Sequence, residues 1–156
     1  MLVFVKKYIK ALIMSGIVII LSFGWNIMTD SIRIDSEHFI NHPGSTYNWL
    51  QIGRYGLVLL KRILCLENYN AFKMGIMSCL FLWISGILLI AGFYFLNKKD
   101  DEWPLGIFLL LYCSSPIWSY QFYFICQEAE IMFALCLTVV AAFLGNICFV
   151  GGGYKE

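Results

Sequence analysis

Long runs of apolar residues alternate with short polar segments along this chain. Apolar runs lie at about residues 11–28, 72–96, 103–124 and 131–150. A run of this kind crosses a hydrocarbon core of about 30 Å when it forms a helix. The run at 72–96 is the clearest because no charged residue follows Lys73 within it. The pattern predicts an all-α, polytopic transmembrane helical protein with about four spans.

The third apolar run is interrupted by Ser114-Ser115-Pro116. A proline has no backbone N–H, so it either kinks a helix or ends it. Aromatic side chains crowd the residues that follow the proline: Trp118, Tyr120, Phe122, Tyr123 and Phe124. They fit either the end of a tilted third span or an aromatic belt at the membrane surface.

Residues 30–70 form the longest polar interval of the chain. The segment His42-Pro43-Gly44-Ser45 has the composition of a turn, because Pro-Gly pairs do not continue a helix. Residues 49–66 mix basic side chains with leucines and predict an amphipathic helix lying at the membrane interface. We expect Lys61 and Arg62 to extend from this helix toward the lipid headgroups.

The composition places the chain outside the range of soluble domains. Hydrophobic residues make up 60% and charged residues 13% of the chain, against about 45–50% and about 25% in a typical soluble domain. The net charge of +1 excludes a basic footprint, so we expect no nucleic-acid partner. Most of the 6 cysteines lie inside apolar runs without short paired spacing, and we interpret them as small hydrophobic residues.

The lysines predict how the spans are oriented in the membrane. Lys6, Lys7 and Lys10 precede the first apolar run, and the pair Lys98-Lys99 follows the second. Cytoplasmic loops are enriched in Lys and Arg, so the N-terminus is expected inside and the polar interval outside. The first run has no obvious small-residue cleavage site, which favours an uncleaved span over a signal peptide. We therefore expect a multi-pass protein of the cell membrane with acidic loops on its outer face.

Four carboxylates near the predicted outer face are candidates for chemistry. Asp35 and Glu37 follow the first span. A carboxylate there can act as a general base on an acceptor hydroxyl or hold a divalent cation that bridges phosphate oxygens. The alternative is a solvated loop in which Asp35 caps a short helix. Glu128 and Glu130 open the last span, where negative charge also stabilises a helix N-terminus; residues two apart point to different sides, so at most one would face a shared cavity.

Arg54 and two histidines complete the set of candidates. The guanidinium of Arg54 matches phosphate oxygens bidentately, although the same side chain could instead extend from an interfacial helix. His38 and His42 lie four residues apart, as metal ligands on a helix often do. The residue before Pro43 is pushed away from helical geometry, and no cysteine partner accompanies the pair. We therefore predict no metal site from these histidines.

The order of these features resembles a known class of membrane enzyme. The acidic Asp35-x-Glu37 and the segment Trp49-Leu50-x-x-Gly53-Arg54 are followed by Ser115-Pro116 and Gln121-Phe122-x-Phe124. This layout resembles the GT-C class of lipid-dependent glycosyltransferases and is most similar to bacterial glucosyltransferases of the O-antigen-modifying type. The resemblance implies transfer of a hexose from a polyprenyl-phosphate carrier to a cell-surface glycan.

The resemblance also implies roles for individual residues. Asp35 or Glu37 would act as the base or orient the acceptor, and Arg54 would lie near the donor phosphate. The remaining substrate-binding candidates are His38, Glu128 and Glu130. The implied partners are a lipid-linked sugar donor, a glycan acceptor and membrane lipids, and the cofactor requirement stays open between none and a divalent cation.

Enzymes of this class have more spans than this chain, so the resemblance covers the N-terminal portion of such an enzyme. We expect residues 1–156 to form a single membrane domain, the N-terminal part of a larger transferase. A half that needs a partner membrane subunit, or an inactive remnant, would fit the same residues. From a different class, a small non-enzymatic multi-span protein, either flippase-like or a packing subunit, also fits. The length and acidity of the polar interval favour the transferase, because a packing subunit needs no such loop.

Overall fold

A computed structural model of the chain describes residues 2–29, 36–42, 47–97, 102–124 and 126–152. All regular secondary structure in these ranges is helical, which confirms the predicted all-α class. The helices, in chain order, are α1 (Leu2–Met28), α2 (Ser36–Asn41), α3 (Tyr47–Gln51), α4 (Tyr55–Ile63), α5 (Ala71–Asn97), α6 (Glu102–Cys113), α7 (Ile117–Gln121) and α8 (Glu128–Gly152).

Three of the helices, α1, α5 and α8, are long and apolar enough to cross a membrane. Their apolar parts, Val3–Met28, Ala71–Leu96 and Glu128–Asn146, have mean hydropathies of 2.0, 2.3 and 1.9. At a rise of about 1.5 Å per residue, the 27 residues of α5 extend about 40 Å, more than the thickness of the hydrocarbon core. The chain is therefore a polytopic helical membrane protein.

The third predicted span, residues 103–124, is divided at the predicted interruption. It consists of α6, which has 12 residues and a length of about 18 Å, and the short helix α7. Pro116 lies at the break. The carbonyl of Tyr112, near the end of α6, accepts hydrogen bonds from the Ser115 N–H (3.3 Å) and from the indole Nε1 of Trp118 (2.7 Å). These donors replace the bonds that an unbroken helix would supply, so the proline ends the helix rather than kinking it.

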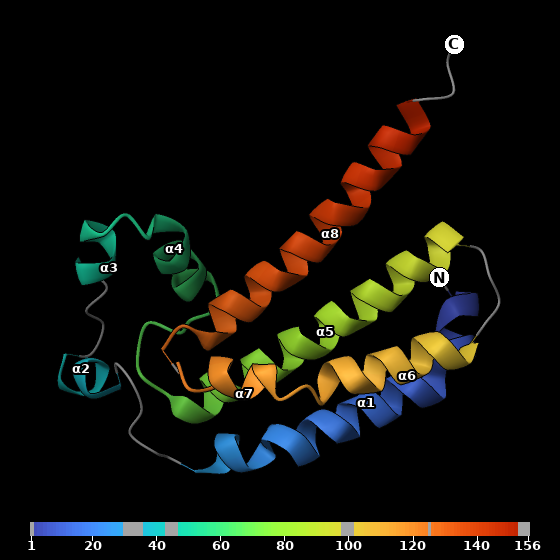
Figure 1. The fold of residues 1–156 in the computed structure, drawn as a ribbon. Helices are drawn as coiled ribbons and strands as arrows, with labels where there is room; N and C mark the ends of the chain where they lie inside the picture. Colours follow the sequence, from blue (N-terminus) through green and yellow to red (C-terminus); the bar gives the residue numbers. More distant parts are fainter. Residues whose placement is uncertain (1, 30–35, 43–46, 98–101, 125, 153–156) are drawn as a thin grey trace.

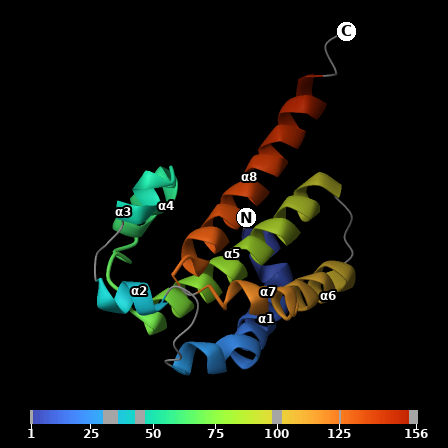
Figure 2. The same ribbon diagram turned by 60° about the vertical axis from the view of Figure 1, so that its left-hand side comes forward.

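Helix α5 is the centre of the bundle and packs against α1, α6 and α8. Successive long helices run in opposite directions, and α8 diverges from the others toward its C-terminal end (Figures 1 and 2). Polar pairs also join the helices: Trp83 Nε1 of α5 donates to Ser15 Oγ of α1 at 2.9 Å. The main core consists of Phe4, Tyr8, Leu12, Ile19, Phe23, Leu82, Ile90, Leu109, Cys113, Phe122 and Met132.

The predicted interfacial helix at 49–66 is divided into two short helices, α3 and α4. Gly53 separates them with a φ of 80°, a left-handed conformation that glycine adopts without a steric cost. Its N–H bonds to the Leu50 carbonyl at 3.0 Å, and the Arg54 N–H bonds to the Trp49 carbonyl at 2.9 Å. This turn folds α4 back beside α3, and both lie outside the main bundle (Figure 1).

Candidate functional site

Most of the predicted site residues lie in segments that meet at one end of the bundle. The C-terminal end of α1, helices α2 to α4, and the N-terminal ends of α5 and α8 are all found there (Figures 1 and 2). We call this region the loop end. Glu37 and His38 belong to α2, Arg54 precedes α4, and Glu128 and Glu130 lie in the first turn of α8. Asp35 lies outside the described residues.

Arg54 connects the polar loop to the beginning of α8. Its guanidinium, on an exposed side chain, donates from Nη1 to Gln127 Oε1 at a distance of 2.9 Å. Gln127 directly precedes Glu128, the first residue of α8. A guanidinium has five N–H donors in a planar fork, so one bond to Gln127 leaves donors that can bind phosphate oxygens bidentately. The hydrogen bond thus holds a guanidinium group beside the residue that precedes α8.

Lys61 and Glu130 form a second connection, which is buried. Lys61 Nζ lies 2.7 Å from Glu130 Oε1, and the two side chains are 0% and 5% exposed. Lys61 Nζ also lies over the ring of Trp49, 5.0 Å from its centroid. The expectation that Lys61 extends to the lipid headgroups is therefore wrong. Val58 and Lys61, one turn apart, are the buried residues of α4, so they share the face that packs on α8.

Arg62, the neighbour of Lys61, has a different environment. Its side chain is 65% exposed, and its Nε lies 3.1 Å from Glu67 Oε1 in a surface ion pair. This exposure agrees with an interfacial position for Arg62. Adjacent positions on a helix do not share a face, so one basic residue of the pair is buried and the other is at the surface.

Glu128 and Glu130 are both buried, with exposed fractions of 1% and 5%. Glu130 points to Lys61 of α4. Residues two apart on a helix point to different sides, so Glu128 does not share this orientation. Negative charge at the start of α8 is also favoured by the helix dipole, so both carboxylates have a structural role.

A small apolar cluster fastens the polar loop to the start of α8. Leu66 of the loop packs with Ala71 and Met74 of α5. The same cluster includes Cys126, just before α8, and Ala129 in the first turn of α8. The start of α5 is fixed by Asn70, whose Oδ1 accepts a hydrogen bond from the Lys73 N–H at 2.9 Å. Between the end of α1 and the start of α5 lies a hollow of about 320 Å³, lined by Ile27, Met28, Tyr69, Asn70, Ala71 and Phe72.

Helix α2 carries the remaining predicted residues at the loop end. Glu37 lies in its first turn and its side chain is exposed. His38 is the next residue of the same helix, and His42, just beyond the helix, is exposed. In the part of the chain that the structure describes, no group of three His, Cys, Asp or Glu side chains lies close enough together to hold a metal ion.

Sequence reasoning missed Lys61, Gln127 and Trp49 as members of this arrangement. The three-residue spacing of Val58 and Lys61 was a signal for Lys61, because it places both on one face of α4. No signal in the sequence pairs Arg54 with Gln127 or Lys61 with Glu130, because these partners are far apart along the chain.

Comparison with known protein families identifies the chain. The family model described as Glucosyl transferase GtrII matches residues 24–150. The chain belongs to the GtrII glucosyl transferase family. The match extends from the end of α1 through the polar loop to α8, so it includes every candidate residue named above. No curated protein and no solved structure matches the chain.

Membership of the GtrII family agrees with the resemblance to bacterial O-antigen glucosyltransferases. It makes this protein a glucosyltransferase-like membrane protein, with a sugar donor and an acceptor as the implied partners. The loop end is the part of this GtrII protein in which basic and acidic side chains from separate segments of the chain meet.

Proposed function

We propose that this GtrII protein transfers glucose, or a similar hexose, from a polyprenyl-phosphate carrier to a cell-surface glycan at its loop end. The observation that carries the proposal is the hydrogen bond between Arg54 and Gln127. This bond supports the proposal because it holds a guanidinium, the side chain best suited to phosphate, next to the start of α8 in a protein of a glucosyl transferase family.

The proposed reaction needs two kinds of group. The acceptor hydroxyl attacks the anomeric carbon of the hexose, the bond from that carbon to the phosphate oxygen breaks, and polyprenyl phosphate leaves. A carboxylate, Asp35 or Glu37, takes the hydroxyl proton as general base or orients the acceptor. Arg54 stabilises the negative charge that develops on the departing phosphate.

The other residues at the loop end have supporting roles in this proposal. The buried pair Lys61–Glu130 fastens α4 to α8 and thereby positions Arg54, which directly precedes α4. Glu128 and His38 complete the proposed substrate-binding set. A divalent cation bridging a loop carboxylate and the donor phosphate is compatible with this chemistry, because carboxylate and phosphate oxygens are the ligands that such ions prefer.

The orientation of the protein in the membrane follows from its lysines. Lys6, Lys7 and Lys10 lie in the first part of α1, at the end of that helix opposite the loop end. The positive-inside tendency assigns the lysine end to the cytoplasm, so the loop end would face outward, where a cell-surface glycan is modified.

The loop carboxylates test this proposal. Asp35→Asn and Glu37→Gln each remove one candidate base with little change in size, and we expect at least one to lower glycan glucosylation about a hundredfold or more. Glu67→Gln is the matched control, because Glu67 is another carboxylate of the polar loop and forms a surface ion pair. The measurement is the hexose content of the surface glycan in cells that express each variant at equal level.

Unchanged glucosylation in both Asp35→Asn and Glu37→Gln would contradict a catalytic role for the loop. The alternative is then a non-enzymatic membrane protein, flippase-like or a packing subunit, which is supported by the exposed apolar side chains of α8 such as Leu137 and Leu144. That alternative predicts normal glycan in all three variants.

A further inference from the structure

A second pocket lies between α1 and α6, away from the loop end. Its volume is about 340 Å³. It is lined by Lys7, Tyr8, Lys10, Ala11, Met14, Gly106, Ile107 and Leu110. The α1 residues of this pocket precede the segment 24–150 that matches the family model. None of the residues that line it belongs to the loop end, so the pocket is separate from the residues proposed for sugar transfer.

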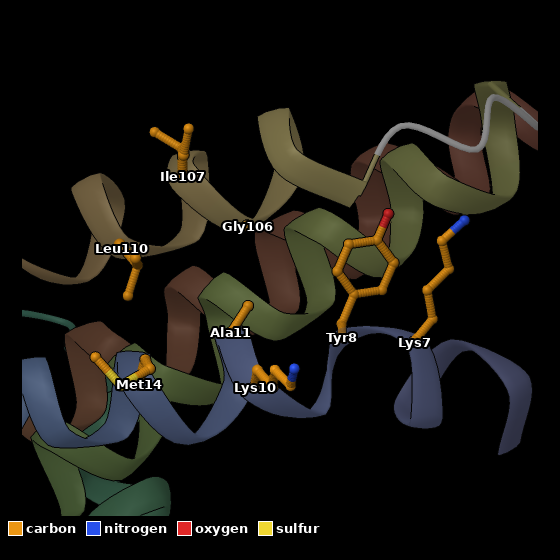
Figure 3. Close-up of a pocket in the computed structure, with 8 residues that line it drawn as sticks. All are labelled: Lys7, Tyr8, Lys10, Ala11, Met14, Gly106, Ile107 and Leu110. Atoms are coloured by element: carbon orange, nitrogen blue, oxygen red, sulfur yellow. The ribbon is translucent and has the colours of Figure 1, made fainter.

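The pocket has a basic polar end and an apolar end. Lys7, Tyr8 and Lys10 lie within one turn of α1, and Met14 lies about 10 Å further along the helix axis than Lys7. Figure 3 shows Lys7 and Tyr8 projecting from α1 toward α6, and Leu110 of α6 projecting back toward α1. No acidic residue is among the described residues that line the pocket.

Packing holds the polar end in place. Tyr8 is 2% exposed, and its ring lies 5.0 Å from that of Phe4 and 6.0 Å from that of Tyr94, measured between centroids. Lys7 Nζ lies 5.6 Å from the centroid of the Tyr94 ring, a cation–π distance. The ammonium group and the hydroxyl are thus carried by side chains that already have fixed neighbours.

The apolar end opens toward the surroundings of the bundle. Met14 is 49% and Ile107 51% exposed, although both lie in apolar helical segments. In a membrane protein such side chains face lipid tails. The groove therefore leads from a pair of lysines directly to the part of the helix surface that contacts the hydrocarbon.

We propose that this pocket binds an anionic phospholipid. The headgroup phosphate would lie near the Lys7 and Lys10 ammonium groups. One acyl chain follows the groove past Ala11, Met14 and Leu110. The charge complementarity and the combination of a basic end with an apolar groove favour a charged lipid over a zwitterionic one or a soluble phosphate.

Native mass spectrometry of the purified full chain, with phosphatidylglycerol and phosphatidylcholine added in turn, tests the proposal. We expect one phosphatidylglycerol to bind in preference to phosphatidylcholine. Lys7→Gln with Lys10→Gln should weaken phosphatidylglycerol binding by about 25-fold, because each lysine near an anionic headgroup contributes about fivefold. Lys6→Gln is the matched control, because Lys6 is exposed at the same end of α1 and does not line the pocket.

A second variant tests the groove without a change of charge. A Cβ at Gly106 would approach the Ala11 Cβ at 3.5 Å, an ordinary contact, so a Cβ fits at this position. Gly106→Leu should fill the groove and weaken binding while all lysines remain. This variant decides the matter if the double lysine variant does not fold.

Several outcomes would overturn the proposal. Equal loss of binding in Lys6→Gln and in the double variant would show a general surface charge effect. Equal binding of the two phospholipids would also overturn it. So would undiminished binding in Gly106→Leu. None of these results bears on transfer at the loop end, so each proposal is tested independently of the other.

Discussion

At the scale of single residues, the ion pair between Lys61 and Glu130 determines how the polar loop is attached. A charge removed from water is costly unless it is paired, and here each buried charge has the other within 2.7 Å. The Trp49 ring adds a cation–π contact on another side of the ammonium group. The contact between α4 and α8 should therefore tolerate the loss of both charges better than the loss of one.

Single and double replacements test this attachment. Glu130→Gln leaves the Lys61 ammonium buried without its counter-ion, and we expect a loss of about 3 to 5 kcal/mol in the free energy of unfolding. Lys61→Met combined with Glu130→Leu should recover most of that loss, because no unpaired charge remains. Unfolding in detergent, followed by circular dichroism, measures the difference. Arg62→Gln is the control, and strictly additive effects of the two replacements would rule out the pair.

At the scale of the helices, small residues set how closely α5 approaches its neighbours. A Cβ added at Gly92 would overlap the ring of Phe143 on α8, and one at Gly86 would crowd Leu109 and Tyr112 of α6. Close approach at glycine is the usual way in which membrane helices gain packing contacts, since water expulsion contributes little between helices in lipid. Gly92 and Gly86 therefore place α8 and α6 on α5.

A substitution at Gly92 tests this contact. Gly92→Ala should destabilise the α5–α8 contact by about 1 to 3 kcal/mol, because the ring of Phe143 must move. The double variant Gly92→Ala with Phe143→Leu should regain part of the stability, since a smaller side chain makes room for the Cβ. Gly145→Ala is the control, because a Cβ there meets nothing within 4 Å. Equal effects at Gly92 and Gly145 in thermal unfolding would show that close packing at Gly92 does not stabilise the α5–α8 contact.

The helices also show how far sequence reasoning extends. The prediction of a span at 72–96 is nearly the same as α5, Ala71–Asn97, because an unbroken apolar run leaves no other structure in lipid. The short helices were harder to predict. Gly53 lay inside a predicted helix, and its left-handed φ of 80° depends on the loop around it. Pro116 was identified as an interruption, but its outcome as a helix end depends on Trp118 supplying a hydrogen bond to Tyr112.

The candidate site was predictable in its residue types but not in its pairs. Arg54, Glu128 and Glu130 were identified because charged groups beside apolar spans are costly to keep there. Arg54 pairs with Gln127 and Glu130 with Lys61, and each pair joins two segments that are far apart along the chain. A single sequence does not show which distant residues are in contact. Lys61 is the example, because its burial depends on which face of α4 meets α8.

At the scale of the whole molecule, two regions with charged side chains lie at opposite ends of the bundle. The loop end carries Arg54, the buried Lys61–Glu130 pair and the start of α8. The opposite end of α1 carries the lysines and the pocket proposed for an anionic phospholipid. The antiparallel order of the long helices produces this division, because it returns the polar loop and the start of α8 to the same end (Figure 1). We propose that the loop end, with Asp35 or Glu37, Arg54 and the start of α8, forms one glucosyl transfer site.

The most direct test is glucose transfer in membranes that contain the full chain. Labelled glucose is supplied on polyprenyl phosphate, and its incorporation into the acceptor glycan is measured for Arg54→Gln and for Arg62→Gln. We expect a loss of about a hundredfold or more in kcat/KM for Arg54→Gln, because a donor to the departing phosphate is removed, and near-normal transfer for Arg62→Gln. Equal transfer by the two variants, at equal expression, would contradict this expectation.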